Sequence, residues 1–154
     1  MALAIGETVV RCSADEVWAV LADFGQISRW APNVDHSSLT TAQTEGVGMV
    51  RRVQVGRNAL LETVTEWKPN EALAYTIEGL PNFLGVVTNR WEIVPIGSST
   101  SIGLTVNIDA GERPPQKLIA NIATRPFGKV VRKMIDGLEH YLGHTDAESQ
   151  EDNQ

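Results

Sequence analysis

The sequence contains few of the residues that hold small folds together covalently or through metals. Cys12 is the only cysteine among 154 residues, and histidine occurs three times. A single cysteine excludes an intramolecular disulfide framework and a thiolate metal cluster. The carboxylates form no clustered ligand set either. We therefore expect neither a metal ion nor a cofactor.

Long apolar runs and an excess of basic charge are also absent. No run approaches the roughly 18 apolar residues that a membrane-spanning helix needs. The first residues, Met-Ala-Leu-Ala-Ile-Gly-Glu, lack the basic region and long apolar core of a signal peptide. The formal net charge of −6 argues against a general nucleic-acid binder. We expect a cytoplasmic monomer or homodimer without nucleic acid or integral membrane association.

The order of the expected elements predicts one α+β domain over residues 1–143. Residues 3–11 read as a strand, and Ser13 and Glu16 form a capping box that opens a short helix. Gly25 suits a left-handed stop at the end of this helix. A second short helical piece carries Ile27 and Trp30. Six strands follow, each bounded by Gly, Pro or Asn, over residues 33–41, 46–55, 59–67, 72–79, 86–96 and 99–109. Consecutive strands with short connections indicate an antiparallel meander.

The last element is a long helix that begins at Pro114-Pro115. Its apolar stripe is Leu118, Ile122, Phe127, Val130, Met134, Leu138 and Tyr141 or Leu142. Pro126 predicts a kink or break near residues 123–125. Residues 144–154 are acidic and rich in Ser and Gln, so we expect a disordered tail.

One hairpin has a predictable register. Val55-Gly56-Arg57-Asn58 suits a two-residue type II′ turn with Gly first. Closure there pairs Val53 with Leu60, Arg51 with Glu62, Met49 with Val64 and Val47 with Glu66, and this more apolar set is expected to face inward. Arg51 and Glu62 then oppose one another on a largely apolar surface, as a self-satisfying pair, a polar anchor for a ligand, or both.

The same alternation assigns inward positions on the later strands. Tyr75 faces inward with Leu73 and Ile77, and Asn89 faces inward with Trp91 and Ile93, unless a bulge reverses the order. Only one of Asp35 and His36 can face in, and the pattern does not choose between them. Residues 79–85 are expected to form either a loop at a cavity mouth, with exposed Phe83 and Leu84, or an ordinary connection.

The order of the expected elements resembles the helix-grip fold: a strand, two short helices, six strands and a long final helix. The similar segments are residues 14–24, Trp30-Ala31-Pro32, residues 46–51, residues 62–69, residues 72–75 and the final helix. The chain resembles the START-related SRPBCC superfamily over residues 2–143. That superfamily includes polyketide cyclase/dehydrase and lipid-transport proteins, the birch-pollen allergen and the plant abscisic-acid receptors. The resemblance implies a curved sheet of about seven strands around the helix, with a deep cavity between them.

The resemblance also bears on the cavity wall. In the hormone receptors the strands similar to residues 48–53, and the glutamate that Glu62 matches, belong to that wall. The receptors' ligand-anchoring lysine has no counterpart in Trp30-Ala31-Pro32-Asn33, and their gate-loop signatures are not recognisable. Hormone reception of that kind is therefore not supported, and the fold by itself does not decide the function.

These observations leave three functional hypotheses. The first is binding or transport of a hydrophobic lipid, polyketide or aromatic metabolite in the cavity. The second is a polyketide cyclase/dehydratase-like enzyme with Glu62, Arg51 and Tyr75 as candidate catalytic groups, although the adjacent arginine opposes a raised carboxyl pKa. The third is an interaction module with a vestigial cavity. The expected ligand-binding residues are Arg51, Glu62, Met49, Val53, Tyr75, Asn89, Trp91, Leu118 and Ile122.

Overall fold

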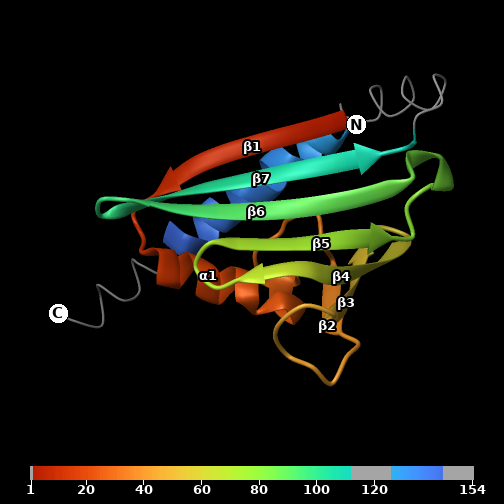
Figure 1. The fold of residues 1–154 in the computed structure, drawn as a ribbon, viewed down its shortest axis with the longest axis horizontal. Coiled ribbons are helices and arrows are strands. Elements are labelled where there is room, and N and C mark those ends of the chain that lie inside the picture. Colours follow the sequence, from red (N-terminus) through yellow and green to blue (C-terminus); the bar gives the residue numbers. More distant parts are fainter. Residues whose placement is uncertain (1, 112–125, 144–154) are drawn as a thin grey trace.

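The computed structural model describes residues 2–111 and 126–143, in which seven antiparallel strands form one continuous sheet. The spatial order is β1-β7-β6-β5-β4-β3-β2, so all strands after β1 follow one another as a meander and β1 closes beside the last (Figure 1). The strands are β1 (Ala2–Val10), β2 (His36–Leu39), β3 (Val50–Val55), β4 (Asn58–Lys68), β5 (Ala72–Glu78), β6 (Val86–Ile96) and β7 (Ser99–Asp109).

The short helices lie where the sequence predicted them. The helix α1 (Ala14–Ala22) begins after Ser13, whose Oγ accepts a hydrogen bond of 3.2 Å from the amide of Glu16. The 3₁₀ helix η1 (Phe24–Arg29) follows directly, and η2 (Asn82–Leu84) lies in the β5–β6 connection. Gly25 does not provide the predicted left-handed stop. It is buried against Leu39, where a Cβ atom would lie 2.8 Å from Cγ of that leucine.

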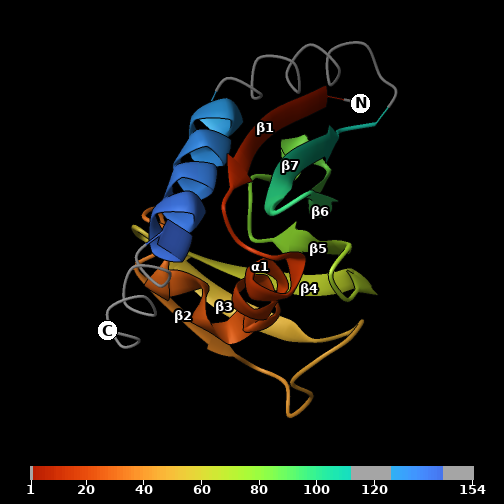
Figure 2. The same cartoon turned by 90° about the vertical axis from the view of Figure 1, so that its left-hand side faces the viewer.

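The sheet curves around the C-terminal helix, which covers its concave side (Figure 2). The chain is helical over residues 126–143, with Val131, Met134, Ile135, Leu138 and Leu142 buried. Two glycines allow the close approach. A Cβ atom at Gly6 would lie 2.6 Å from Cγ1 of Val131, and one at Gly137 would collide with the carbonyl oxygen of Trp30. This arrangement confirms the predicted helix-grip fold.

Part of the predicted final helix lies outside the described residues. This applies to its start at Pro114-Pro115, to Leu118 and Ile122, to the break near residues 123–125 and to the tail over residues 144–154. Within the described part, the predicted inward stripe of Met134, Leu138 and Leu142 is confirmed, while Phe127, Val130 and Tyr141 are half-buried.

The predicted β3–β4 hairpin has the expected turn and register. Val55 pairs with Asn58, Val53 with Leu60 and Arg51 with Glu62. A type II′ turn requires a positive φ at its first central residue and a negative φ at its second. Gly56 has φ 58°, whereas Arg57 does not have a positive φ. The amide of Gly56 is further held by Oδ2 of Asp35 at 2.8 Å.

The far end of this hairpin differs from the prediction. Val47 does not pair with Glu66, because β3 begins only at Val50 and Val47 lies exposed in a turn flanked by Gly46 and Gly48 at positive φ. Glu66 does not face inward either. The β4–β5 register shifts between Val64 and Glu66, and such a bulge moves every later side chain to the opposite face.

Candidate functional site

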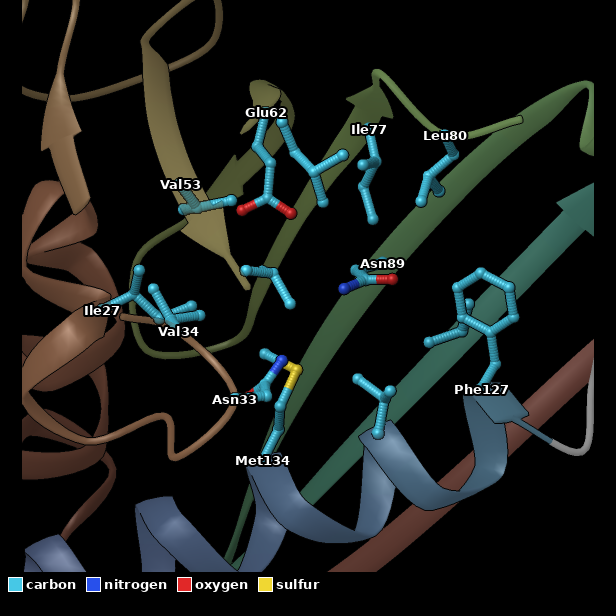
Figure 3. Close-up of a pocket in the computed structure, with 14 residues that line it drawn as sticks. Ile27, Asn33, Val34, Val53, Glu62, Ile77, Leu80, Asn89, Phe127 and Met134 are labelled. Atoms are coloured by element: carbon cyan, nitrogen blue, oxygen red, sulfur yellow. The ribbon is translucent and has the colours of Figure 1, made fainter. Parts of the chain in front are cut away.

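A cavity of about 140 Å³ lies between the concave face of the sheet and the C-terminal helix. Its floor comes from β3 to β7, and Phe127, Val130 and Met134 of the helix close it from the other side (Figure 3). The lining residues are Ile27, Asn33, Val34, Val53, Val55, Leu60, Glu62, Ile77, Leu80, Asn89, Val106, Phe127, Val130 and Met134. A void of this order holds one small aromatic molecule.

Arg51 and Glu62 form a buried ion pair at the wall of this cavity. Nε of Arg51 donates to Oε1 of Glu62 at 2.7 Å, and the two side chains are 3% and 7% exposed. Nη1 of Arg51 donates to the carbonyl oxygen of Phe24 at 3.0 Å. The guanidinium carbon also lies 3.7 Å from the ring centroid of Phe24 and 4.6 Å from that of Tyr75. Arg51 is thus held by a charge, a carbonyl and two aromatic faces.

The pair is arranged so that only its acidic member reaches the cavity. Glu62 lines the cavity and Arg51 does not, and Figure 3 shows the carboxylate of Glu62 pointing into the space. Because the strands pair in register, Arg51 and Glu62 stand side by side on the inner face. Arg51 therefore positions the carboxylate from behind.

Behind the cavity, Tyr75 forms the centre of a small polar network. Its hydroxyl oxygen accepts from Nδ2 of Asn89 at 3.3 Å and from Nε1 of Trp91 at 3.4 Å. Tyr75 is completely buried, and burial raises the pKa of its hydroxyl above the ordinary value of 10.0. The nearby positive charge of Arg51 lowers that pKa, but less than burial raises it. Tyr75 is therefore a neutral hydrogen-bonding group at neutral pH.

Three buried side-chain atoms around the site have no hydrogen-bond partner among the residues that the structure describes. They are Nη2 of Arg51, Oδ1 of Asn89 and Oδ1 of Asn33. Asn89 and Asn33 both line the cavity. A buried polar group without a partner is costly in an apolar interior. These two amides are thus groups that a polar atom of a ligand could satisfy.

The structure sorts the predicted ligand-binding residues into three groups. Val53, Glu62 and Asn89 line the cavity. Met49, Arg51, Tyr75 and Trp91 are buried in the layer behind it. Leu118 and Ile122 lie outside the described residues.

Other positions differ from expectation. Neither Asp35 nor His36 faces the cavity, since both side chains are exposed. Asn33 was not predicted as a lining residue. It lies in the irregular segment before β2, where strand alternation gives no orientation, and only its place after Trp30-Ala31-Pro32 could have drawn attention to it.

A groove of about 450 Å³ adjoins the cavity between the β3–β4 turn and the β5–β6 connection. It is lined by Val55, Asn58, Leu60, Gly79, Leu80, Pro81 and Asn82. Val55, Leu60 and Leu80 line both spaces. Residues 79–85 therefore lie at the mouth of the cavity, as one of the two interpretations predicted. Phe83 is exposed there as expected, whereas Leu84 is buried and anchors the connection.

No group of three or more His, Cys, Asp or Glu side chains in residues 2–111 and 126–143 is arranged to hold a metal ion. His140 stands four residues before His144, but His144 is outside those ranges. None of the described helices is long and apolar enough to cross a membrane.

Residues 4–143 match the family described as polyketide cyclase / dehydrase and lipid transport. The chain belongs to this family. The match includes nearly all of β1, the six other strands and the described C-terminal helix, and it places the chain in the SRPBCC superfamily. A search of the curated proteins finds no match.

Solved structures resemble this family member over nearly the whole chain. A protein from Thermobifida fusca is 24% identical with a TM-score of 0.76, covering 94% of this chain and 95% of that one. A START superfamily protein from Mycobacterium smegmatis is 15% identical with a TM-score of 0.72, covering 93% and 98%. The Zhui aromatase/cyclase from Streptomyces sp. R1128 is 19% identical with a TM-score of 0.70, covering 92% and 93%. At these identities the likeness establishes the helix-grip fold and no more.

Proposed function

We propose that the protein binds a hydrophobic small molecule in the cavity between the sheet and the C-terminal helix. The observation that carries this proposal is an apolar cavity with one carboxylate and two amides in its wall. Small-molecule sites are usually of this kind, mostly apolar with a few placed polar groups. Membership of a family described by lipid transport and polyketide cyclisation supports the same class of ligand.

The cavity and its adjoining groove suggest how such a ligand is held. The enclosed space of about 140 Å³ takes one ring or a short chain. The groove that shares Val55, Leu60 and Leu80 with it accommodates the remainder of a longer molecule. Exposed Phe83 in the β5–β6 connection lies beside this route and is suited to cover it.

Mass spectrometry of a solvent extract from gently purified protein tests the proposal. We expect an apolar molecule to co-purify with the wild-type chain. A Val130→Trp variant, which fills the cavity from the helix side, should carry at least tenfold less of it. Leu61→Trp is the matched control, because Leu61 is exposed and does not line the cavity. Equal loading of Val130→Trp and wild type, or no ligand on any variant and no thermal stabilisation by an apolar library, contradicts the proposal.

A second candidate is an aromatase/cyclase-like enzyme, favoured by the position of Glu62. Its carboxylate reaches into the cavity while Arg51 holds it from behind, and the ring of Tyr75 lies against the guanidinium of Arg51. In such an enzyme Glu62 would exchange protons with the bound substrate. Turnover of a linear polyketide by wild type, lost in Glu62→Gln with affinity retained, would establish this role. Turnover that survives in Glu62→Gln would exclude it and leave binding as the function.

A further inference from the structure

The charges around the cavity bear on which hydrophobic molecules can enter it. Eleven of the fourteen lining residues are apolar, and the other three are Asn33, Glu62 and Asn89. None of these fourteen is a lysine, arginine or histidine. A ligand carboxylate or phosphate would therefore find no cationic side chain in the described lining, and it would face the carboxylate of Glu62. An unpaired buried anion is strongly disfavoured.

The positive charge that pairs with Glu62 is held behind the wall of the cavity. Arg51 gives Nε to Glu62 and Nη1 to the carbonyl oxygen of Phe24, and its guanidinium lies against two aromatic rings. Its Nη2 has no partner among the described residues, but Arg51 does not line the cavity. The Glu62 oxygen that Arg51 contacts is Oε1. The carboxylate, which points into the cavity in Figure 3, keeps acceptor capacity on its other oxygen, because an ionised carboxylate only accepts hydrogen bonds.

Asn89 adds a second polar contact to the same space. Its side chain is buried, it extends from β6 into the cavity, and Oδ1 has no partner in the described part of the chain. Its Nδ2 is occupied by the hydroxyl oxygen of Tyr75. Oδ1 of Asn33, which also lines the cavity, is buried without a partner in the described residues as well. The unpartnered polar atoms of the lining are thus oxygen acceptors, on Glu62, Asn89 and Asn33.

We propose that the cavity selects an uncharged, ring-sized apolar group with a hydroxyl that donates a hydrogen bond to Glu62, and that the cavity rejects anionic ligands. This inference rests on the proposed binding function and names the chemical class of its ligand. The hydroxyl is the complement of the acceptors on Glu62 and Asn89, and the ring is the complement of the aliphatic walls. A carboxylate on the same ring is excluded by charge and a methyl group leaves the acceptors without a donor.

Phenol, toluene and benzoate are suitable probes because they share one ring and differ in the group under test. Dissociation constants come from titrations followed by ¹H–¹⁵N spectra of the full chain at neutral pH. We expect phenol to bind about tenfold more tightly than toluene, the gain typical of one hydrogen bond to a charged acceptor. Benzoate should bind at least tenfold more weakly than phenol. Val130→Trp should abolish the binding of all three.

A double variant separates the hydrogen bond from the shape of the cavity. Arg51→Met with Glu62→Leu removes both charges together, so neither is left buried and unpaired. This variant should still bind toluene, while its preference for phenol falls to about threefold or less. A wild type that binds toluene as tightly as phenol, or benzoate more tightly than phenol, overturns the inference and leaves the proposed binding function standing. If none of the three probes binds, the inferred ligand class is also overturned. The proposed binding function is then contradicted only if no apolar molecule co-purifies with the protein.

Discussion

Two arginine–glutamate pairs in one sheet have almost the same contact distance and very different surroundings. Arg51 and Glu62 meet at 2.7 Å on the inner face, with side chains 3% and 7% exposed. Arg90 and Glu66 meet at 2.8 Å on the outer face, with side chains 41% and 27% exposed. Their contributions to stability should therefore be governed by burial, because the distance is nearly the same.

The outer pair spans three strands. Arg90 and Glu66 are both cross-strand partners of Ala74, whose small side chain leaves the space above it open for their contact. Glu66 also meets Lys68 at 3.3 Å, and Arg90 meets Glu92 at 3.3 Å. The hydrogen bond from Arg90 lowers the pKa of Glu66 below its ordinary value of 4.5 and outweighs the opposing effect of burial. Water screens this network, so its net contribution is small.

The largest expected effect comes from breaking the inner pair on one side only. Glu62→Leu leaves the guanidinium of Arg51 buried without its counter-charge. We expect the free energy of unfolding to fall by about 3–5 kcal/mol, measured by urea denaturation. A loss below about 1 kcal/mol would show that the inner pair behaves like the outer one.

The matched control removes both inner charges. Arg51→Met combined with Glu62→Leu should recover most of the stability, ending within about 1 kcal/mol of wild type or above it, because the desolvation cost of both ions disappears. If the double variant is as unstable as Glu62→Leu, the single loss has to be assigned to packing and not to charge.

Tyr75→Phe should have an intermediate effect. The variant keeps the ring under Arg51 but removes the oxygen that accepts from Asn89 and Trp91. We expect a loss of about 1–3 kcal/mol at neutral pH, the cost of leaving buried donors without an acceptor. Thermal denaturation of both proteins measures it, and an unchanged transition would refute the importance of this network.

The same tyrosine predicts a dependence on alkaline pH. Its folded-state pKa is raised by burial, so the contribution of the Tyr75 hydroxyl to the stability of the fold is complete below the unfolded pKa of about 10. It is lost as the pH rises through the folded value, because only the unfolded tyrosine then ionises freely. The stability gap between wild type and Tyr75→Phe should shrink from pH 9 upward. A gap that stays constant to pH 11 would contradict the raised pKa.

The smallest effect belongs to the outer pair. Glu66→Gln should cost no more than about 1 kcal/mol at pH 7, after allowance for solvent screening at these partly exposed groups. Since the folded pKa of Glu66 is lowered, its contribution is present above pH 4.5 and is lost as the pH falls through the folded value. Denaturant titrations at pH 7 and in acid compare the free energies of unfolding of wild type and Glu66→Gln. A difference between them that grows on acidification would contradict the lowered pKa.

Strict alternation with a clear turn made much of the sheet predictable. The expected strands at residues 86–96 and 99–109 match β6 and β7 at both ends. Ile96 and Ser99 are paired across the two residues between them, one of which is Gly97 at φ 58°. The pairing of Arg51 with Glu62 followed from the same kind of turn at Gly56. A tight turn fixes the register, and the register fixes which side chains meet.

The cavity was less predictable because alternation gives the face of a side chain and not its depth. Tyr75 and Trp91 face inward as expected, yet they are packed behind the cavity, whereas Asn89, the cross-strand partner of Tyr75, reaches it. The strand expected at residues 33–41 is shorter in the structure, where β2 covers only His36–Leu39. Asn33 reaches the cavity from the irregular segment before this strand, and no periodic pattern describes such a segment.

The register shift between Val64 and Glu66 separates the two environments compared above. Along β4, every second residue faces inward at Leu60, Glu62 and Val64. One additional residue after Val64 then breaks this alternation. Without it, Glu66 would face the interior while Trp67, which packs edge-on against Trp18 of α1 at 4.9 Å, would turn to solvent. The additional residue Thr65 thus reverses the alternation of the strand. Before it Glu62 faces the cavity, and after it Glu66 faces solvent.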